Sequence, residues 1–245
     1  MKQNKFINAL IGEWKNYSRS QILVINALLC AIVMLFALVP IKIGALDLAV
    51  IPIIAIIISA EVMGLANGML TGLFFGLVSF LNHLVKHPSV LSDIFVKNPL
   101  VTFLPRILIG VTVFFVIKLF DLLWNKIESS PKYQSKPIKK NAFDTAKYAV
   151  GSLLGVITNT AGVLGFIYAF YAGTELSSGT AISGGFITAI IVSNSILEAV
   201  VCTILVPPIT MAVKKTLQKT TRKNSSPAIT NDNSNDPSES SDSEK

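Results

Sequence analysis

Long apolar runs separated by short polar segments dominate the chain. A helix that crosses the hydrocarbon core of a membrane needs about 20 mostly apolar residues. By this criterion the predicted spanning helices cover residues 22–40, 45–63, 65–85, 100–124, 148–172 and 183–206. The second and third almost touch in sequence, so we expect a very tight turn at Gly64. The pair Pro207 and Pro208 should kink or end the last helix.

Three polar segments lie outside these spans. In residues 1–20, apolar side chains recur at helical spacing, which predicts a cytoplasmic helix lying in the membrane interface, with an unstructured leader as the alternative. Residues 125–147 are rich in lysine and contain two prolines, and we expect a mobile cytoplasmic linker between two three-helix halves. The segment 216–245 holds almost no large apolar side chain and is expected to be a disordered cytoplasmic tail.

The distribution of Lys and Arg predicts the orientation of the chain. With the N-terminus inside, most basic residues fall in the cytoplasmic segments. The loops on the opposite side hold only Lys42, Lys86 and Lys97. Because cytoplasmic loops carry an excess of positive charge, both termini are predicted to be cytoplasmic. The expected fold is an all-α integral membrane protein, a bundle of six transmembrane helices.

Composition supports a membrane protein rather than a water-soluble enzyme. Of the 245 residues, 51% are hydrophobic and only 14% are charged, and the mean hydropathy is +0.61. The net charge of +7 favours contact with a lipid surface, and not with nucleic acid, because the lysines stand at the edges of apolar runs. Cys30 and Cys202 both lie inside such runs and are interpreted as small core residues.

No motif for catalysis or for a resident cofactor is apparent. The sequence lacks both the GxxxxGK[ST] phosphate loop and the HExxH zinc motif. His83 and His87 lie four residues apart, but two ligands without a third do not make a catalytic zinc site. We therefore predict no catalytic residues, no metal and no cofactor, and we do not expect an enzyme.

Small residues recur every four positions on two predicted helices. Ala27 and Ala31 form an AxxxA pair, and glycines occupy positions 64, 68, 72 and 76. Small-xxx-small patterns allow helix backbones to approach closely in lipid. For the glycine ridge, packing inside this bundle is favoured over docking to another subunit. For the alanine pair, the residues alone leave both readings open.

Polar side chains inside spans are costly and indicate functional sites by default. The candidates inside the predicted spans are Arg106, Asn159, Asn194 and Glu198, and Asn98, just before the span 100–124, is a further predicted binding residue. A structural ion pair between Arg106 and Glu198 is the alternative. Depth argues against direct pairing, because at 1.5 Å per residue Arg106 should lie roughly 9 Å, and Glu198 roughly 20 Å, below the outer ends of their helices.

These features resemble a known family of membrane proteins. The strings NPLVTFLPRILIG, TNTAGVLGFIYAFY and NSILEAVVCTILVPPI, with six spans and AxxxA in the first, are similar to the substrate-binding S component of energy-coupling factor (ECF) vitamin transporters. The resemblance covers roughly residues 20–215 and is greatest to the subgroup that includes pantothenate S components. Nothing in the family's motif fixes which vitamin this chain binds.

The resemblance implies a function and partners. An S component captures a vitamin at the outer side of the bacterial plasma membrane and releases it inward after toppling. A T component and two ATPases form the module that supplies the energy, and the alanine motif, here Ala27 and Ala31, contacts the T component. Pantothenate is the expected substrate, because its carboxylate suits Arg106 and its hydroxyl and amide groups suit the asparagines.

Other functions remain open at this stage. Another vitamin, such as cobalamin, riboflavin or folate, would occupy the same role. A stand-alone secondary carrier driven by an ion gradient would use Glu198, the only deep acid, for a proton relay. A membrane scaffold without transport would need the buried polar groups only for folding.

Overall fold

The computed structural model describes residues 19–38, 41–43, 46–48, 50–86, 91–129, 140–176 and 181–225. The expected interfacial segment 1–20, apart from its last two residues, lies outside the described residues, and so does His87. Five described helices are long and apolar enough to cross a membrane, and a sixth apolar helix is shorter. The prediction of a helical membrane protein is therefore confirmed, whereas six full spans are not.

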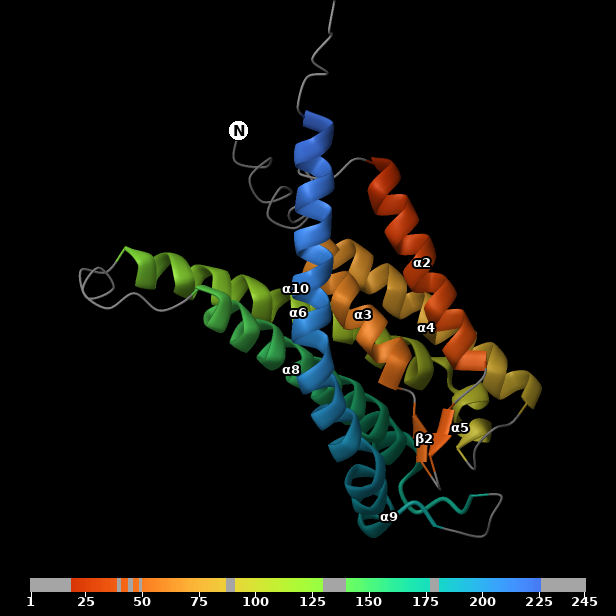
Figure 1. Cartoon of the computed structure of the whole chain (residues 1–245). Coiled ribbons are helices and arrows are strands. Elements are labelled where there is room, and N and C mark those ends of the chain that lie inside the picture. Colours follow the sequence, from red (N-terminus) through yellow and green to blue (C-terminus); the bar gives the residue numbers. More distant parts are fainter. Residues whose placement is uncertain are drawn as a thin grey trace, which may run out of the picture.

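The bundle is built from helices that follow the apolar runs (Figure 1). They are α2 (Arg19–Leu38), α3 (Val50–Met63), α4 (Leu65–Lys86), α5 (Ser92–Lys97), α6 (Pro99–Glu128), α8 (Lys140–Tyr171), α9 (Gly184–Ile190), the π-helix η2 (Ile191–Ser195) and α10 (Ile196–Ser225). Figure 1 shows α5, α9 and the strand β2 gathered at one end of the bundle. We call this the outer end, since the predicted orientation places it there.

The second predicted span, 45–63, begins later than expected. Strands β1 (Ile41–Ile43) and β2 (Leu46–Leu48) form an antiparallel hairpin in which Lys42 is opposite Asp47. The segments IKI and LDL alternate apolar and polar residues with the two-residue period of a strand, which a count of apolar residues does not detect. α3 is left with 14 residues, or about 21 Å of helix. Twelve of them are buried, so α3 is the central helix of the core.

The glycine-rich face of α4 packs inside the bundle, as predicted. Gly64 adopts a positive φ of 90° and makes the tight turn between α3 and α4. A Cβ atom added to Gly68 would lie 2.7 Å from the Cβ of Ala60 and 3.2 Å from the Cα of Gly110 on α6. A Cβ on Gly72 would collide with the carbonyl oxygen of Arg106. The missing side chains therefore let α4 lie directly against α3 and α6.

Three helix ends differ from the predictions. α6 runs to Glu128 and α8 begins at Lys140, so both helices extend into the predicted linker 125–147. Contacts between polar and aromatic side chains hold these extensions together, including the ring pair Trp124–Phe143 at 4.7 Å. α10 also continues through Pro207 and Pro208 to Ser225, so residues 216–225 of the predicted disordered tail are helical. Proline is tolerated in such helices, because neighbouring groups compensate for its missing hydrogen bonds.

Candidate functional site

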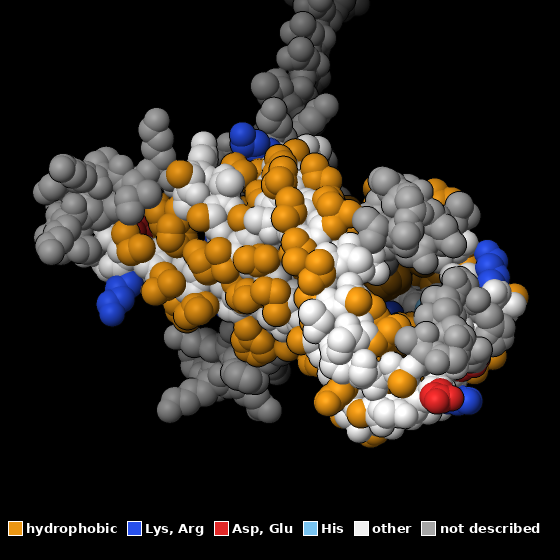
Figure 2. All heavy atoms as spheres, turned by 90° about the horizontal axis from the view of Figure 1, so that it is seen from below, with side chains coloured by type: hydrophobic (Ala, Val, Ile, Leu, Met, Phe, Trp, Pro, Cys, Tyr) orange, Lys and Arg blue, Asp and Glu red, His pale blue; other side chains and the backbone are white. Residues whose placement is uncertain are grey.

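A polar cavity of about 270 Å³ opens near the outer end of the bundle. Side chains from α4, α6, α8, η2 and α10 line most of it, and α2, α3, α5 and α9 contribute the rest. Figure 2 shows the molecule from below the view of Figure 1, with a hollow among the side chains of this face. Four of the five predicted binding residues line this cavity: Arg106, Asn159, Asn194 and Glu198.

Arg106 is held in the cavity wall by its own helix. The preceding residue, Pro105, has no N–H, so it cannot donate to the carbonyl of Val101 four residues earlier. Nη1 of Arg106 donates to that carbonyl at 3.1 Å. In a helix without proline, the carbonyl of Val101 would accept from the backbone N–H of residue 105. Here it accepts from the side chain of Arg106 instead.

The guanidinium of Arg106 lacks a carboxylate partner. Its Cζ lies 5.6 Å from the ring centroids of both Phe75 and Phe95, within the range of cation–π attraction. The side chain is 8% exposed, and its Nε has no hydrogen-bond partner among the described residues. Glu198 is close enough to interact electrostatically, but no ion pair within 4.0 Å joins the two in the described part of the chain. The alternative interpretation, a direct ion pair between Arg106 and Glu198, is therefore not realised in the described structure.

The two predicted asparagines of the cavity also have buried oxygens without partners in the described structure. Oδ1 of Asn159 on α8 and Oδ1 of Asn194 in η2 are buried without a hydrogen bond within the described ranges. Asn194 belongs to a single π-helical turn, a feature that is frequent at functional sites. Glu198 follows one turn later and is 8% exposed. The cavity thus offers a cation with an unused N–H together with acceptors for ligand donors.

The fifth predicted binding residue, Asn98, has a different role. It stands at the N-cap of α6, where its Oδ1 accepts from the backbone N–H of Leu100 at 3.2 Å. Asparagine is a preferred N-cap residue, because its side-chain oxygen satisfies a free N–H of the first turn. It is not among the residues that line the cavity.

The sequence reasoning missed several polar residues of the same cavity, most of them on α4. Asn82 donates to the carbonyl of Ala37 at 3.2 Å, while its Oδ1 is buried without a partner in the described structure. His83 lies 3.0 Å from the hydroxyl of Ser92, and its ring lies 4.6 Å from that of Phe95. In the sequence, these residues form a polar cluster at the end of an apolar span. Such a cluster is also found at ordinary helix ends, so it did not indicate a site.

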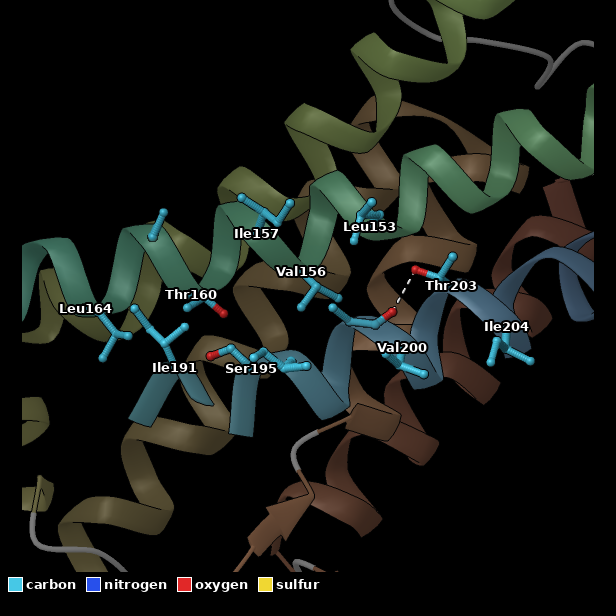
Figure 3. Close-up of a pocket in the computed structure, with 13 residues that line it drawn as sticks. Leu153, Val156, Ile157, Thr160, Leu164, Ile191, Ser195, Val200, Thr203 and Ile204 are labelled. Atoms are coloured by element: carbon cyan, nitrogen blue, oxygen red, sulfur yellow. Dashed lines mark hydrogen bonds between the residues drawn. The ribbon is translucent and has the colours of Figure 1, made fainter. Parts of the chain in front are cut away.

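A larger hollow of about 650 Å³ lies between α8 and the η2–α10 helix (Figure 3). Aliphatic side chains such as Leu153, Ile157 and Ile204 form most of its wall. The hydrogen bond drawn there joins the hydroxyl of Thr203 to the carbonyl of Ala199 at 2.7 Å, so it is satisfied within the helix. None of the predicted binding residues lines this apolar hollow, and the polar cavity remains the candidate site.

The alanine pair lies away from the cavity. Ala27 and Ala31 are both exposed on α2, and the neighbouring Val24 and Leu28 are 62% and 60% exposed. Unlike the glycine ridge of α4, this small-residue pair is not used for packing within the described bundle. Its role in partner docking stays a prediction.

Comparison with known proteins identifies the family. A family model described as "ECF transporter, substrate-specific component" matches residues 21–210, which is 190 of the 245 residues. No curated protein matches the chain. The matched range includes the whole polar cavity and the alanine pair. The chain therefore belongs to the substrate-specific components of ECF transporters, which are substrate-binding subunits of vitamin importers and not enzymes.

Proposed function

We propose that this S component captures a small anionic vitamin, with pantothenate the best match, in the polar cavity at the outer end. One observation carries the proposal: the buried guanidinium of Arg106 has an unpartnered Nε and no carboxylate within salt-bridge distance in the described structure. A guanidinium holds a carboxylate through two charge-assisted hydrogen bonds. The carboxylate of the ligand would form the salt bridge with Arg106 that no protein carboxylate forms in the described structure.

The remaining polar atoms support a ligand with several hydrogen-bond donors. The oxygens of Asn82, Asn159 and Asn194 are buried acceptors without partners among the described residues. Pantothenate carries two hydroxyls and one amide N–H besides its carboxylate, so it has a donor for each of them. A buried acceptor that stays unpaired costs about 1–3 kcal/mol, so a ligand that satisfies these atoms gains affinity.

Cavity size bears on the alternative vitamins. A volume of about 270 Å³ is at the lower limit of ordinary ligand sites. Cobalamin, with its corrin ring and nucleotide loop, is much larger than such a cavity. Riboflavin lacks a carboxylate for Arg106. Folate has carboxylates but adds a pterin and an aromatic ring, so pantothenate is the one of these four vitamins that best combines a small size with a single anionic group.

Transport would follow from the family's architecture. We infer that the T component docks on α2 through Ala27 and Ala31, and that two ATPases drive the toppling that releases the vitamin to the cytoplasm. The exposure of both alanines supports this arrangement.

The experiment is calorimetric titration of the purified full chain with pantothenate, riboflavin, folate and cobalamin. Native mass spectrometry of the same sample would identify any vitamin that co-purifies. We expect one pantothenate per chain and much weaker binding of the other three. Tight binding of cobalamin or riboflavin with none of pantothenate would refute the substrate assignment.

A further inference from the structure

A second polar cavity lies at the opposite end of the bundle from the vitamin site. It has a volume of about 440 Å³ and is formed by the last turns of α6, the first turns of α8 and the stretch of α10 around Lys214. We call it the lysine cavity. None of its lining residues belongs to the outer cavity.

The lysine cavity carries excess positive charge. Four lysines and two aspartates line it, which leaves two positive charges. Lys147 is 7% exposed and is paired with Asp121 at 3.0 Å and Asp144 at 3.2 Å. Lys140 and Lys215 are exposed and form no ion pair with any residue that the structure describes. They therefore provide the uncompensated charge.

The wall of the lysine cavity combines aromatic rings with lysine side chains. The rings of Trp124 and Phe143 lie 4.7 Å apart in its wall. The Lys214 ammonium lies 5.1 Å from the centroid of the buried Tyr148 ring. Trp and Tyr are enriched where a membrane meets water, and Lys is enriched on the cytoplasmic side. The lysine cavity combines both features at one end of three long apolar helices.

We propose that the lysine cavity binds a phosphate group, carried by an anionic phospholipid of the cytoplasmic leaflet or by a soluble phosphate ester. Lysine ammonium groups bind phosphate as point charges. Basic pockets between transmembrane helices on the cytoplasmic side bind lipid headgroups. The amide groups of Asn125 and Asn141 line the same cavity and add N–H donors for phosphate oxygens. The site is separate from the vitamin cavity and does not depend on its assignment.

The test measures lipid binding to the full chain by native mass spectrometry, with phosphatidylglycerol and phosphatidylcholine as probes. We expect a clear preference for phosphatidylglycerol. Replacing both rim lysines (Lys140→Gln with Lys215→Gln) should weaken that binding by about fivefold per lysine. The matched control is Lys126→Gln, which removes an exposed lysine of α6 that does not line the cavity, and it should leave binding unchanged.

A second variant should act in the opposite direction. Asp144→Asn raises the cavity charge by one and leaves Lys147 paired with Asp121. It should tighten phosphatidylglycerol binding, again by about fivefold. Competition with glycerol 3-phosphate separates the two sources of phosphate: displacement of the lipid supports a soluble ester, and its absence supports the headgroup. The proposal is overturned if the two lipids bind equally or if Lys126→Gln weakens binding as much as the rim variant does.

Discussion

Among the described residues, each end of the bundle buries one cationic side chain, and the two side chains have different partners. At the end opposite the outer cavity, Lys147 is 7% exposed and pairs with two carboxylates. In the outer cavity Arg106 is 8% exposed and contacts one backbone carbonyl and two aromatic rings. No carboxylate lies within 4.0 Å of it in the described structure.

The difference distinguishes a charge that is paired within the protein from a charge that we propose is paired by a ligand. A buried cation that is paired within the protein holds elements together, here α6 and α8 through Lys147 and Asp121. A buried cation without a counter-charge lowers stability, because its desolvation is not repaid by a partner. A protein that retains such a group benefits when an anionic ligand completes the pair. The two regions therefore predict opposite responses to removal of the charge.

The largest effect is expected from loss of the binding charge. Arg106→Met removes the cation but keeps a long apolar side chain between Phe75 and Phe95. Vitamin binding should weaken by about 2–5 kcal/mol, the cost of breaking a desolvated charge pair. The melting temperature of the empty protein should change little, because the variant removes a desolvated charge but also the cation–π contacts with two rings and the electrostatic attraction to Glu198. Titration and thermal unfolding of one preparation measure both, and unchanged vitamin affinity would demote Arg106 to a structural residue.

Removal of the structural charge should give the reverse pattern. Lys147→Met leaves Asp121 and Asp144 without their shared partner, but these side chains are 43% and 25% exposed and can be rehydrated. We expect a loss of stability of about 1–2 kcal/mol, below the value for a fully buried pair. Vitamin affinity should be unchanged. If this variant lost vitamin binding at normal stability, the separation of the two ends would be wrong.

A smaller effect is expected from the cavity amides. Asn194→Ala should weaken vitamin binding by about 1 kcal/mol, the contribution of one hydrogen bond. The matched control is Asn98→Ala, which removes the N-cap of α6 and should lower stability by about 1 kcal/mol without changing affinity. Equal losses of vitamin affinity in both variants would show that lining the cavity does not determine which asparagine contributes to binding.

Substitutions on α2 should have the smallest effect on vitamin affinity and on stability. Ala27→Trp or Ala31→Trp adds bulk to an exposed face, so vitamin affinity and stability should both be retained. Uptake should nevertheless fall, because a large side chain blocks close approach of a partner helix. Uptake by cells and co-purification of the T component provide the readouts. Normal uptake by both variants would contradict docking through this face.

Much of the fold follows from simple sequence rules. The lengths of the apolar runs located the long helices, and Gly64 located the turn between α3 and α4. The spacing of Gly68, Gly72 and Gly76 predicted an internal helix contact, and these residues lie against Ala60, Arg106 and Phe103. These features are local or periodic, so a single sequence contains them.

Features that depend on tertiary contacts were missed. The β1–β2 hairpin was hidden inside an apolar stretch, and the extension of α8 to Lys140 depends on contacts with α6. Arg106, Asn159, Asn194 and Glu198 were selected because polar groups are rare in spans, and all four line one cavity, while their role in binding stays a prediction. Asn82, which also lines the cavity, was not selected, and Asn98 was selected but caps a helix outside the cavity. Helix ends carry polar residues for several reasons, which sequence spacing does not separate.

The central claim is that Arg106 supplies the charge that binds the vitamin, and one comparison of ligands tests it directly. Panthenol has the structure of pantothenate with the carboxylate replaced by a neutral hydroxymethyl group. The ratio of the two dissociation constants should be measured by titration on the unaltered protein and on Arg106→Met. In the unaltered protein, panthenol should have a much larger dissociation constant than pantothenate. In Arg106→Met the ratio of the two constants should fall to about one, since only the charge pair distinguishes the ligands. A preference of the same size in both proteins would contradict it.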